Sequence, residues 1–350
     1  MSQKGLANVT AGETALCKLG GESEELYYRG YNACKLADNY TFEAIAFLLF
    51  KGHLPSEQEI DTYTNELRQL TSMPVEVEKT LRELPEDANA MDVLRTGVSL
   101  LGIYEPETDN YQGLDIANRL LVLLPRFLAI WRGISIPDNA TIAEAVCLAC
   151  CDETVDEAFV DAMNQSLILY AEHEFNASTF AARVTSATLS DMYSAICSAI
   201  GTLRGPLHGG ANEQALYLIK SFENVESVES GIKQKLSDKE KLMGFGHRVY
   251  KTKDPRSHKL YNILDSLPNT ELFDIAKEIE RVMMDEKHLI SNVDFYTAVL
   301  YEQMKIKPNL FVAIFVFGRI VGWAAHVLEQ RNNNRLIRPL ADYVGPDPID

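Results

Sequence analysis

The sequence has few basic residues for its size. Lysine and arginine together number 33 among 350 residues, against 50 aspartates and glutamates, so the formal net charge is −17. Nucleic acids and anionic membrane surfaces attract basic proteins, and this deficit therefore argues against nucleic acid or membrane as a main partner. An anionic small-molecule substrate remains compatible with the sequence, but local arginines would have to overcome the unfavourable charge of the whole chain.

A targeting segment and an uninterrupted apolar span are also missing. The N-terminus MSQKGLANVTAGE has neither the apolar stretch of a secretory signal nor the Arg-rich pattern of a transit peptide. The longest apolar run, NLFVAIFVFGRIVGWAAHVL, is interrupted by Arg319 after about nine residues, whereas crossing a bilayer takes about 20. We therefore expect a cytoplasmic protein in which this run forms a buried core helix.

Cysteine is scarce, and its spacing fits neither a zinc site nor a disulfide framework. The six cysteines are Cys17, Cys34, Cys147, Cys150, Cys151 and Cys197. The cluster CLACC contains one C-x-x-C pair, but a second pair and a histidine at zinc spacing are both missing. We expect free thiols that pack on an apolar helix in a reducing compartment, and no metal site.

Regularly alternating strand patterns are absent beyond the N-terminal segment. There, TALCKL and ELYYRGY, joined by GGESE, predict a small β-hairpin. Helical spacing of apolar residues then continues nearly to the end. The run TFEAIAFLLFKGHLP predicts a helix that ends at Gly52, and Ser56 with Glu59 forms a capping box that opens a helix to about Leu70. The pattern predicts an all-α fold.

One histidine stands between two glycine-containing pairs in GPLHGGAN, residues 205–212. The glycines permit close approach of another backbone or a ligand. We expect His208 at the N-terminal end of the following helix, where the helix dipole would keep the ring neutral and able to donate a hydrogen bond to a carbonyl. A capping or core histidine is the alternative interpretation.

Two further histidines follow motifs that resemble known sites without completing them. In MGFGHRVY, the pattern G-x-G-x-x-G fails at Val249, so we expect a loop that presents His247 rather than a nucleotide site. In YAEHEFNAST, the zinc motif H-E-x-x-H fails at Ala177, which leaves His173 within an unusual polar cluster. A solvated helix end is the alternative for that cluster.

A carboxylate and several arginines complete the candidate site. Asp294, among the apolar residues of NVDFYTAV, could be a general base with a raised pKa, an N-cap, or both. Arg319 lies between two apolar stretches and needs an acidic neighbour or an anionic ligand. Arg338, in a Pro-containing loop, raises the same question. Together with Arg256, these residues suggest a polycarboxylate site with proton abstraction next to a carbonyl.

Six segments in this order resemble the citrate synthase family: YAEHEFNAST, GPLHGGANE, GFGHRVYKTKDPR, NVDFY, GRIVGWAAH and IRPLADY. The resemblance implies an all-α homodimer with an N-terminal hairpin. It implies a small domain at 210–318 and a large domain formed by 1–209 and 319–350. It also implies condensation of an acyl-CoA with oxaloacetate, with the CoA thioester as co-substrate and neither a metal nor a permanently bound cofactor.

The resemblance also implies individual roles. His208 looks like the donor to the thioester carbonyl, Asp294 like the base that removes the α-proton, and His247 like the group that polarises the oxaloacetate ketone. The oxaloacetate-binding residues would be His173, Arg256, Arg319 and Arg338, the last reaching the site of the other subunit. The segment Lys239, Glu240, Lys241, Leu242, Met243 and Gly244 resembles the loop that holds the adenine part of CoA.

The identity of the acyl-CoA is left open by the sequence. YAEHEFNASTF has Tyr170 where many citrate synthases have histidine, and it resembles 2-methylcitrate synthases, which prefer propionyl-CoA. Arg248 is instead shared with ordinary citrate synthases, which use acetyl-CoA. We expect the propionyl-CoA activity with a side activity on acetyl-CoA, because one methylene is worth only about 1–3 kcal/mol of discrimination. A metal-dependent hydrolase and a non-catalytic helical scaffold are more remote alternatives.

Overall fold

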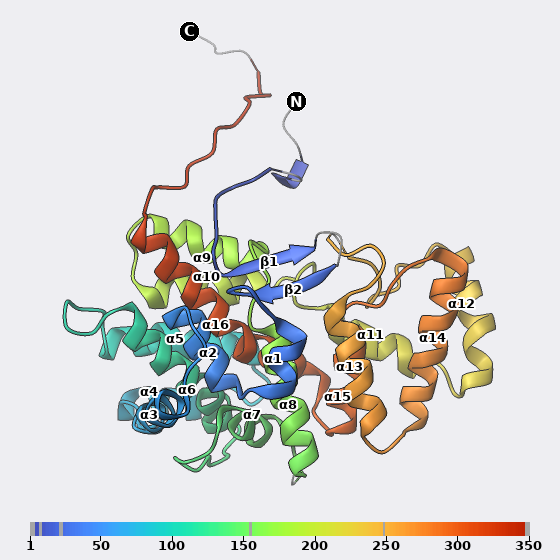
Figure 1. The fold of residues 1–350 in the computed structure, drawn as a ribbon, viewed down its shortest axis with the longest axis horizontal. Coiled ribbons are helices and arrows are strands. Elements are labelled where there is room, and N and C mark those ends of the chain that lie inside the picture. Colours follow the sequence, from blue (N-terminus) through green and yellow to red (C-terminus); the bar gives the residue numbers. More distant parts are fainter. Residues whose placement is uncertain (1–3, 7–8, 21–23, 154–155, 248, 347–350) are drawn as a thin grey trace.

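The computed structural model describes residues 4–6, 9–20, 24–153, 156–247 and 249–346. Within these residues the chain is helical nearly throughout (Figure 1). The helices of the first two thirds are α1 (Ala33–Asn39), α2 (Phe42–Lys51), α3 (Glu57–Arg68), α4 (Val75–Arg82), α5 (Ala90–Tyr104), α6 (Gly113–Trp131), α7 (Ile142–Cys150), α8 (Glu157–Tyr170), α9 (Ala177–Ala187) and α10 (Met192–Leu203). The all-α prediction is confirmed.

The last third adds α11 (Ala211–Lys220), α12 (Val228–Ser237), α13 (Pro255–Ser266), α14 (Glu271–Lys287), α15 (Val293–Gln303) and α16 (Phe311–Asn332). Short 3₁₀ turns are η1 (Lys4–Leu6), η2 (Val225–Ser227) and η3 (Pro308–Leu310). Helices α11 to α15 lie together at one side of the molecule, and the C-terminal segment 333–346 runs away from the body as an exposed chain (Figure 1). The proposed division at residues 210 and 318 encloses this group of helices, and it stays a prediction.

The predicted hairpin is present near the N-terminus. Strand β1 (Cys17–Gly20) pairs antiparallel with β2 (Glu25–Tyr28), with Cys17 opposite Tyr28. The sequence did not predict β3 (Tyr31–Asn32), a two-residue strand that pairs with β2 after a turn at Arg29 and Gly30, both of which have positive φ. A strand this short contains too few residues to produce an alternating pattern.

Local capping explains the helix boundaries that were predicted. Helix α2 ends where Gly52 takes the left-handed conformation, φ 90°, that glycine adopts without strain. Helix α3 begins at the capping box of Ser56 and Glu59, as predicted, and ends at Arg68, two residues before the expected Leu70. These signals depend only on neighbouring residues, so they can be recognised in the sequence.

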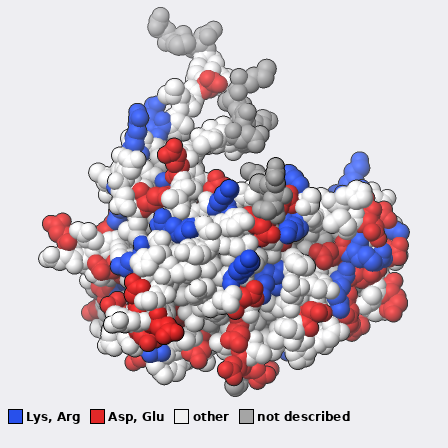
Figure 2. Space-filling view, viewed as in Figure 1, with Lys and Arg blue, Asp and Glu red and all other residues white. Residues whose placement is uncertain are grey.

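Helix α16 lies in the interior of the protein, as the sequence predicted. It packs against α2, α6, α8, α9 and α10. The segment Pro308–Asn332 is long and apolar enough to cross a membrane, but 89% of its most apolar window is buried inside the protein. Acidic side chains are spread over the visible surface, both over the α11–α15 side and over the rest (Figure 2). All six cysteines are free thiols, as expected.

Candidate active site

His208 lies in a tight turn just before α11. Its backbone N–H donates to the carbonyl of Gly205 (2.9 Å), and Gly210 is the N-cap of the helix. Gly209 has no room for a side chain, because a Cβ there would stand 2.3 Å from the carbonyl oxygen of Leu203 and 2.8 Å from Val312. The glycine therefore permits the close backbone approach that the sequence suggested, and it fixes the turn that presents His208.

The hydrogen bonds of His208 define its tautomer. Nε2 accepts from the backbone N–H of Ser178 (3.3 Å) and lies 2.8 Å from the Ser178 hydroxyl. Nδ1 then carries the proton of the neutral ring and can donate to a ligand. Burial, followed by the positive charge of Arg319, lowers the pKa of His208 to about 4. The ring is therefore neutral as predicted, but the cause is desolvation and Arg319 rather than the helix dipole.

His247 has the opposite tautomer. Nδ1 accepts from the backbone N–H groups of Val249 (3.1 Å) and Tyr250 (3.2 Å), so Nε2 carries the proton. The ring stacks on Tyr250 at 4.7 Å. Burial and then the nearby Arg256 guanidinium lower the pKa of His247 to about 4. A neutral imidazole that carries its proton on Nε2 is a hydrogen-bond donor at neutral pH.

His173 and Arg256 lie beside His247. The rings of His173 and His247 are 5.2 Å apart, edge to face, and an Arg256 terminal nitrogen is 3.5 Å from His247 Nε2. His173 Nε2 is buried without a hydrogen-bond partner within the described structure. Burial first, and then Arg256, Arg319 and His247, lower the pKa of His173 well below its usual value. A buried ring nitrogen with no partner is suited to a polar ligand atom.

Asp254 connects Arg256 to the helix that carries the carboxylate. Its two oxygens accept from the Arg256 guanidinium at 3.0 and 2.8 Å, a bidentate pair that raises the pKa of Arg256. Oδ2 also accepts from the backbone N–H of Val293 at the start of α15 (3.2 Å). Arg256 therefore has a fixed position relative to Asp294.

Arg319 is almost completely buried in the middle of α16. Its Nε donates to the carbonyl of Tyr170 (2.6 Å), and its guanidinium carbon lies 4.6 Å from the centre of the Phe315 ring. In the part of the chain that the structure describes, no carboxylate forms an ion pair with it. Burial lowers the pKa of Arg319, and Glu172 partly opposes this effect. Its charge therefore lacks a close partner, which is the condition that an anionic ligand would satisfy.

Asp294 lies in the first turn of α15, but it is not the N-cap. That position belongs to Asn292, whose side chain accepts from the Asp294 backbone N–H (3.1 Å). Asp294 Oδ1 instead accepts from the hydroxyl of Tyr170 (3.1 Å). Burial raises the pKa of Asp294 to about 6, while Arg256 and the Tyr170 hydrogen bond oppose the rise. The N-cap interpretation is wrong, and the carboxylate is suited to exchange a proton near neutral pH.

Six of the seven residues predicted for catalysis and oxaloacetate binding therefore lie around one region. At this region the turns that carry His208 and His247 meet α8, α13, α15 and α16. In the polar cluster at His173, Glu172 is completely buried and Glu174 is exposed, so the solvated-end interpretation applies to only part of the cluster. Arg338 is the exception, since it lies exposed in the segment after α16 and makes no hydrogen bond or ion pair within the described residues. Arg248, used in the acyl-CoA comparison, lies outside the described residues.

The expected CoA segment ends next to the start of α15. Gly244 has φ 91°, and its carbonyl accepts from the Asn292 backbone N–H (2.9 Å). A Cβ at Gly244 would lie 2.8 Å from the Phe295 ring. Residues 239–243 precede this point and are exposed or half-buried. The segment is thus anchored two residues from Asp294 while its preceding part remains open to a ligand.

The sequence analysis did not assign Ser178 or Asp254 to the site, and it singled out Tyr170 only in comparing acyl-CoA substrates. Ser178 holds the His208 ring, Asp254 fixes Arg256, and the Tyr170 hydroxyl binds the carboxylate of Asp294. Only Asp254 gave a local signal, because Asp-Pro is a common helix opening and Asp254 is the N-cap of α13. Within the described ranges, no group of three or more His, Cys, Asp or Glu side chains could hold a metal ion.

Comparisons with known proteins agree over the whole chain. Residues 5–340 match the family described as "Citrate synthase, C-terminal domain". A 2-methylcitrate synthase of Shewanella oneidensis is 42% identical over 98% of this chain and 95% of its own, and citrate synthase 2 of Bacillus subtilis is 40% identical over 98% and 96%.

Two solved structures extend this agreement to the fold. Citrate synthase from Thermotoga maritima has a TM-score of 0.90 at 35% identity. The match covers 100% of this chain and 98% of the Thermotoga maritima chain. A ternary complex of the Thermoplasma acidophilum citrate synthase with carboxymethyl coenzyme A and oxaloacetate has a TM-score of 0.89 at 31% identity, covering 99% of this chain and 97% of that one.

The fold and the cluster of imidazoles, arginines and a carboxylate thus define a mostly helical acyltransferase, an enzyme whose transferred acyl group becomes an alkyl group in a condensation. More specifically, the chain belongs to the citrate synthase family, whose members use oxaloacetate and an acyl-CoA. Relatives named 2-methylcitrate synthase and citrate synthase 2 are nearly equally similar to this chain, at 42% and 40% identity, so the family leaves the acyl group open.

Proposed function

We propose that the protein is a 2-methylcitrate synthase, which condenses propionyl-CoA and oxaloacetate with water to give 2-methylcitrate and CoA, with a side activity on acetyl-CoA. The observation that carries the chemistry is the pairing of Asp294, whose pKa is raised to about 6, with two neutral imidazoles, each with one ring N–H free to donate. Citrate synthase activity is the second candidate, favoured by the 40% identical relative.

In the first step, the Asp294 carboxylate removes a proton from the carbon next to the thioester carbonyl. That proton is far too weakly acidic for a free carboxylate at neutral pH. Removal becomes feasible when the Nδ1–H of His208 donates to the carbonyl oxygen as it gains negative charge, an effect worth about 3–4 kcal/mol per donor. The raised pKa of Asp294 assists by making the carboxylate a stronger base.

In the second step, the enol carbon attacks the ketone of oxaloacetate. The Nε2–H of His247 polarises that ketone and supplies the proton to its oxygen. Arg256, Arg319 and the unpartnered Nε2 of His173 bind the oxaloacetate carboxylates and fix their orientation. Water then cleaves the thioester bond, releasing CoA and leaving the product with a third carboxylate.

The preference for propionyl-CoA rests on Tyr170 and on the relatives. The Tyr170 ring is fully buried against Phe315 (4.5 Å), and its hydroxyl bonds both Asp294 and Thr297 (2.9 Å). It therefore lies beside the carbon from which the proton is taken, where one methyl group distinguishes the two substrates. The 42% identical relative from Shewanella oneidensis is a 2-methylcitrate synthase.

The test compares kcat/KM for propionyl-CoA and acetyl-CoA at saturating oxaloacetate. We expect a ratio above one, of about 10 to 200. Tyr170→His should lower this ratio, whereas Tyr301→Phe should not, because the buried hydroxyl of Tyr301 is hydrogen-bonded to Ser166 and not to Asp294. A wild-type preference for acetyl-CoA would assign citrate synthase activity instead.

We further propose a cytoplasmic homodimer that serves propionate catabolism through the methylcitrate cycle. Support for the dimer comes from segment 333–346, which exposes large apolar side chains with little of this chain against them: Leu336, Leu340, Tyr343 and Val344. Apolar side chains of this kind favour contact with a second subunit. Such a contact would also give Arg338 a place in the partner's site.

A further inference from the structure

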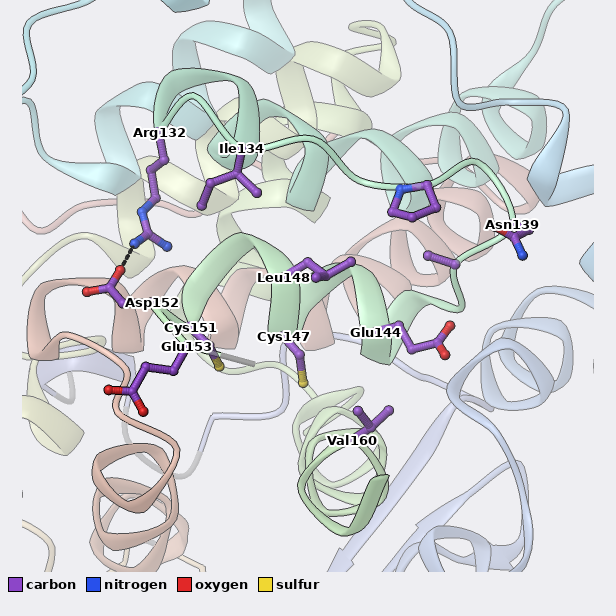
Figure 3. Close-up of a pocket in the computed structure, with 12 residues that line it drawn as sticks. Arg132, Ile134, Asn139, Glu144, Cys147, Leu148, Cys151, Asp152, Glu153 and Val160 are labelled. Carbon is purple, nitrogen blue, oxygen red and sulfur yellow. Dashed lines mark hydrogen bonds and ion pairs between the residues drawn. The ribbon is translucent and has the colours of Figure 1, made fainter. Parts of the chain in front are cut away.

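Charged side chains bind backbone groups of distant segments at several places in the described structure. Arg132, at the end of α6, donates to the Ala149 carbonyl and binds Asp152 beside a cavity of about 810 Å³ (Figure 3). None of the described residues that line this cavity is a candidate site residue. Glu24, immediately before β2, makes contacts of the same kind, but these go to the loop that presents His247.

The Glu24 carboxylate binds three consecutive backbone N–H groups of that loop. Oε1 accepts from Lys251 (2.7 Å), and Oε2 accepts from Thr252 (2.7 Å) and Lys253 (2.9 Å). Oε2 also accepts from the Thr252 hydroxyl (2.6 Å). These partners are 227 to 229 positions from Glu24 in the sequence, and the end of the β1–β2 hairpin lies beside the loop that leads to α13 (Figure 1). The carboxylate therefore joins the N-terminal hairpin to this loop.

Two side chains bind the backbone of the loop. Residues 249–253 belong to neither a helix nor a strand, so their N–H groups need other acceptors. The N–H groups of Val249 and Tyr250 donate to Nδ1 of His247. Those of residues 251–253 donate to Glu24. The first two contacts determine which ring nitrogen of His247 carries the proton, and Glu24 fixes the chain directly after them.

The hairpin also contacts the loop at a second point. A Cβ added at Gly20, the last residue of β1, would lie 3.1 Å from Cγ1 of Val249. The Thr252 hydroxyl and then the Lys253 backbone N–H lower the pKa of Glu24 to about 2, although desolvation opposes them. The carboxylate is thus ionised at neutral pH, and both of its oxygens can accept hydrogen bonds from the loop.

We propose that Glu24 is a positioning residue for His247. By fixing residues 251–253, it keeps the N–H groups of Val249 and Tyr250 against Nδ1 of His247, so that the Nε2 proton is directed at the substrate ketone. This inference rests on the proposed function, in which His247 polarises that ketone. Loss of the carboxylate should therefore impair formation of the carbon–carbon bond more than binding of the acyl-CoA.

The test compares Glu24→Gln with Glu25→Gln in the full-length protein. Gln has one acceptor oxygen, and its NH₂ group cannot accept from the loop. Glu25 instead binds the side chains of Asn32 and Lys253. Glu24→Gln should lower kcat by about 10- to 100-fold and leave KM for the acyl-CoA nearly unchanged. Glu25→Gln should keep the wild-type kcat, as should Arg132→Gln, which removes the backbone contact beside the cavity of Figure 3.

Hydrogen–deuterium exchange gives a second measurement that does not depend on activity. The amides of residues 251–253 should exchange at least about tenfold faster in Glu24→Gln than in the wild type, with no such change in Glu25→Gln. Unchanged exchange in the other peptides and circular dichroism check that each variant is folded.

Three outcomes would overturn the proposal. Unchanged exchange in Glu24→Gln would show that the carboxylate does not hold the loop. Faster exchange with a wild-type kcat would show that His247 does not depend on the contact. An equal loss of kcat in Glu25→Gln would show that the backbone contacts have no special part. A wild type that condenses neither acyl-CoA would instead reject the proposed function, and the exchange rates would still decide whether Glu24 fixes the loop.

Discussion

Two histidines of the active site are neutral for the same reason and donate through different atoms. Burial lowers the pKa of His208 and of His247 to about 4 each. Ser178 occupies Nε2 of the first ring, whereas backbone N–H groups occupy Nδ1 of the second. Each ring thus carries a single N–H, and the direction of that N–H is set by the group that holds the opposite nitrogen.

The first prediction at this scale concerns pH. Asp294 must be ionised to accept a proton, so kcat/KM should fall as the pH decreases through about 6, while the two histidines stay neutral down to about 4. Tyr170→Phe removes a hydrogen-bond donor that stabilises the Asp294 carboxylate, so it should raise the pKa of Asp294. The fall of kcat/KM on the acid side of the pH profile, called the acid limb below, should then occur at higher pH. The measurement is kcat/KM from pH 5 to 9.

Tyr301→Phe is the matched control for the pH profile, since it removes a buried tyrosine hydroxyl of α15 whose hydrogen bond goes to Ser166 rather than to Asp294. Its acid limb should coincide with that of the wild type. A Tyr170→Phe limb that stays in place, or that moves to lower pH, would contradict the role assigned to the Tyr170 hydroxyl.

A second prediction concerns Arg319, whose buried charge lacks a close carboxylate. Arg319→Leu should raise KM for oxaloacetate by about 10²-fold or more, since a charge-assisted hydrogen bond to a buried partner is worth about 2–5 kcal/mol. KM for the acyl-CoA should change much less. Arg126→Leu, which removes another buried arginine bound only to carbonyls, is the control for general loss of packing. An unchanged oxaloacetate KM in Arg319→Leu would remove Arg319 from the binding site.

At the scale of elements, loops and helix ends carry the side chains of the candidate site, and the packing of the helices fixes where those ends lie. The His208 turn precedes α11, the His247 loop precedes α13, and Asp294 lies in the first turn of α15. Asp254 joins two of these elements by binding both Arg256 and the start of α15. The positions of the reacting groups therefore depend on how these ends pack together.

The prediction at this scale is a pair of glycine substitutions in one turn. Gly209→Ala places a Cβ 2.3 Å from the Leu203 carbonyl oxygen, so the turn must shift and carry His208 with it. We expect kcat to fall by at least about tenfold and stability to fall by about 1–3 kcal/mol. Gly205→Ala should be nearly neutral, because its nearest contact is 3.4 Å. The measurements are kcat and thermal unfolding; equal effects of both substitutions would contradict the steric argument.

At the scale of the whole molecule, a strongly acidic protein brings two of its buried arginines, Arg256 and Arg319, to one site. The net charge is −17, yet Arg256 and Arg319 lie together with neutral histidines around the proposed oxaloacetate position. This arrangement answers the charge problem raised by the sequence, because local positive charge in a desolvated site outweighs distant screened carboxylates. The remaining arginine, Arg338, is far out on segment 333–346, and its role depends on assembly.

A heterodimer tests that role. Asp294→Ala and Arg338→Leu subunits with different tags are co-expressed, and the mixed dimer is purified. If Arg338 acts in the partner's site, one of the two sites is then intact, so the mixed dimer should have about half the wild-type activity. The Asp294→Ala homodimer should be nearly inactive. The Arg338→Leu homodimer should bind oxaloacetate weakly. Activity no greater than the average of the two parents would place Arg338 in its own subunit's site or in none.

Sequence reasoning alone predicted the helical fold, the β1–β2 hairpin and the residues of the candidate site. Caps, apolar spacing and Gly-containing turns act over a few neighbouring positions, so α2, α3 and the β1–β2 hairpin could be predicted from local patterns. The resemblance of six ordered segments then supplied the residues of the candidate site. The N-cap interpretation of Asp294 was wrong because two neighbouring polar residues could both fill that position, and Asn292, two residues earlier, is the N-cap.

Only the tertiary structure decided the tautomers, the pKa of Asp294 and the partners of the buried groups. Tyr170 and Asp294 are 124 positions apart, and His208 and Ser178 are 30 apart, yet these pairs set the proton positions in the site. The physical reason is that desolvation and hydrogen bonding depend on which atoms are adjacent in space. Chain neighbours specify a helix and its ends, whereas the charge state of a buried side chain is set by the whole set of elements packed around it.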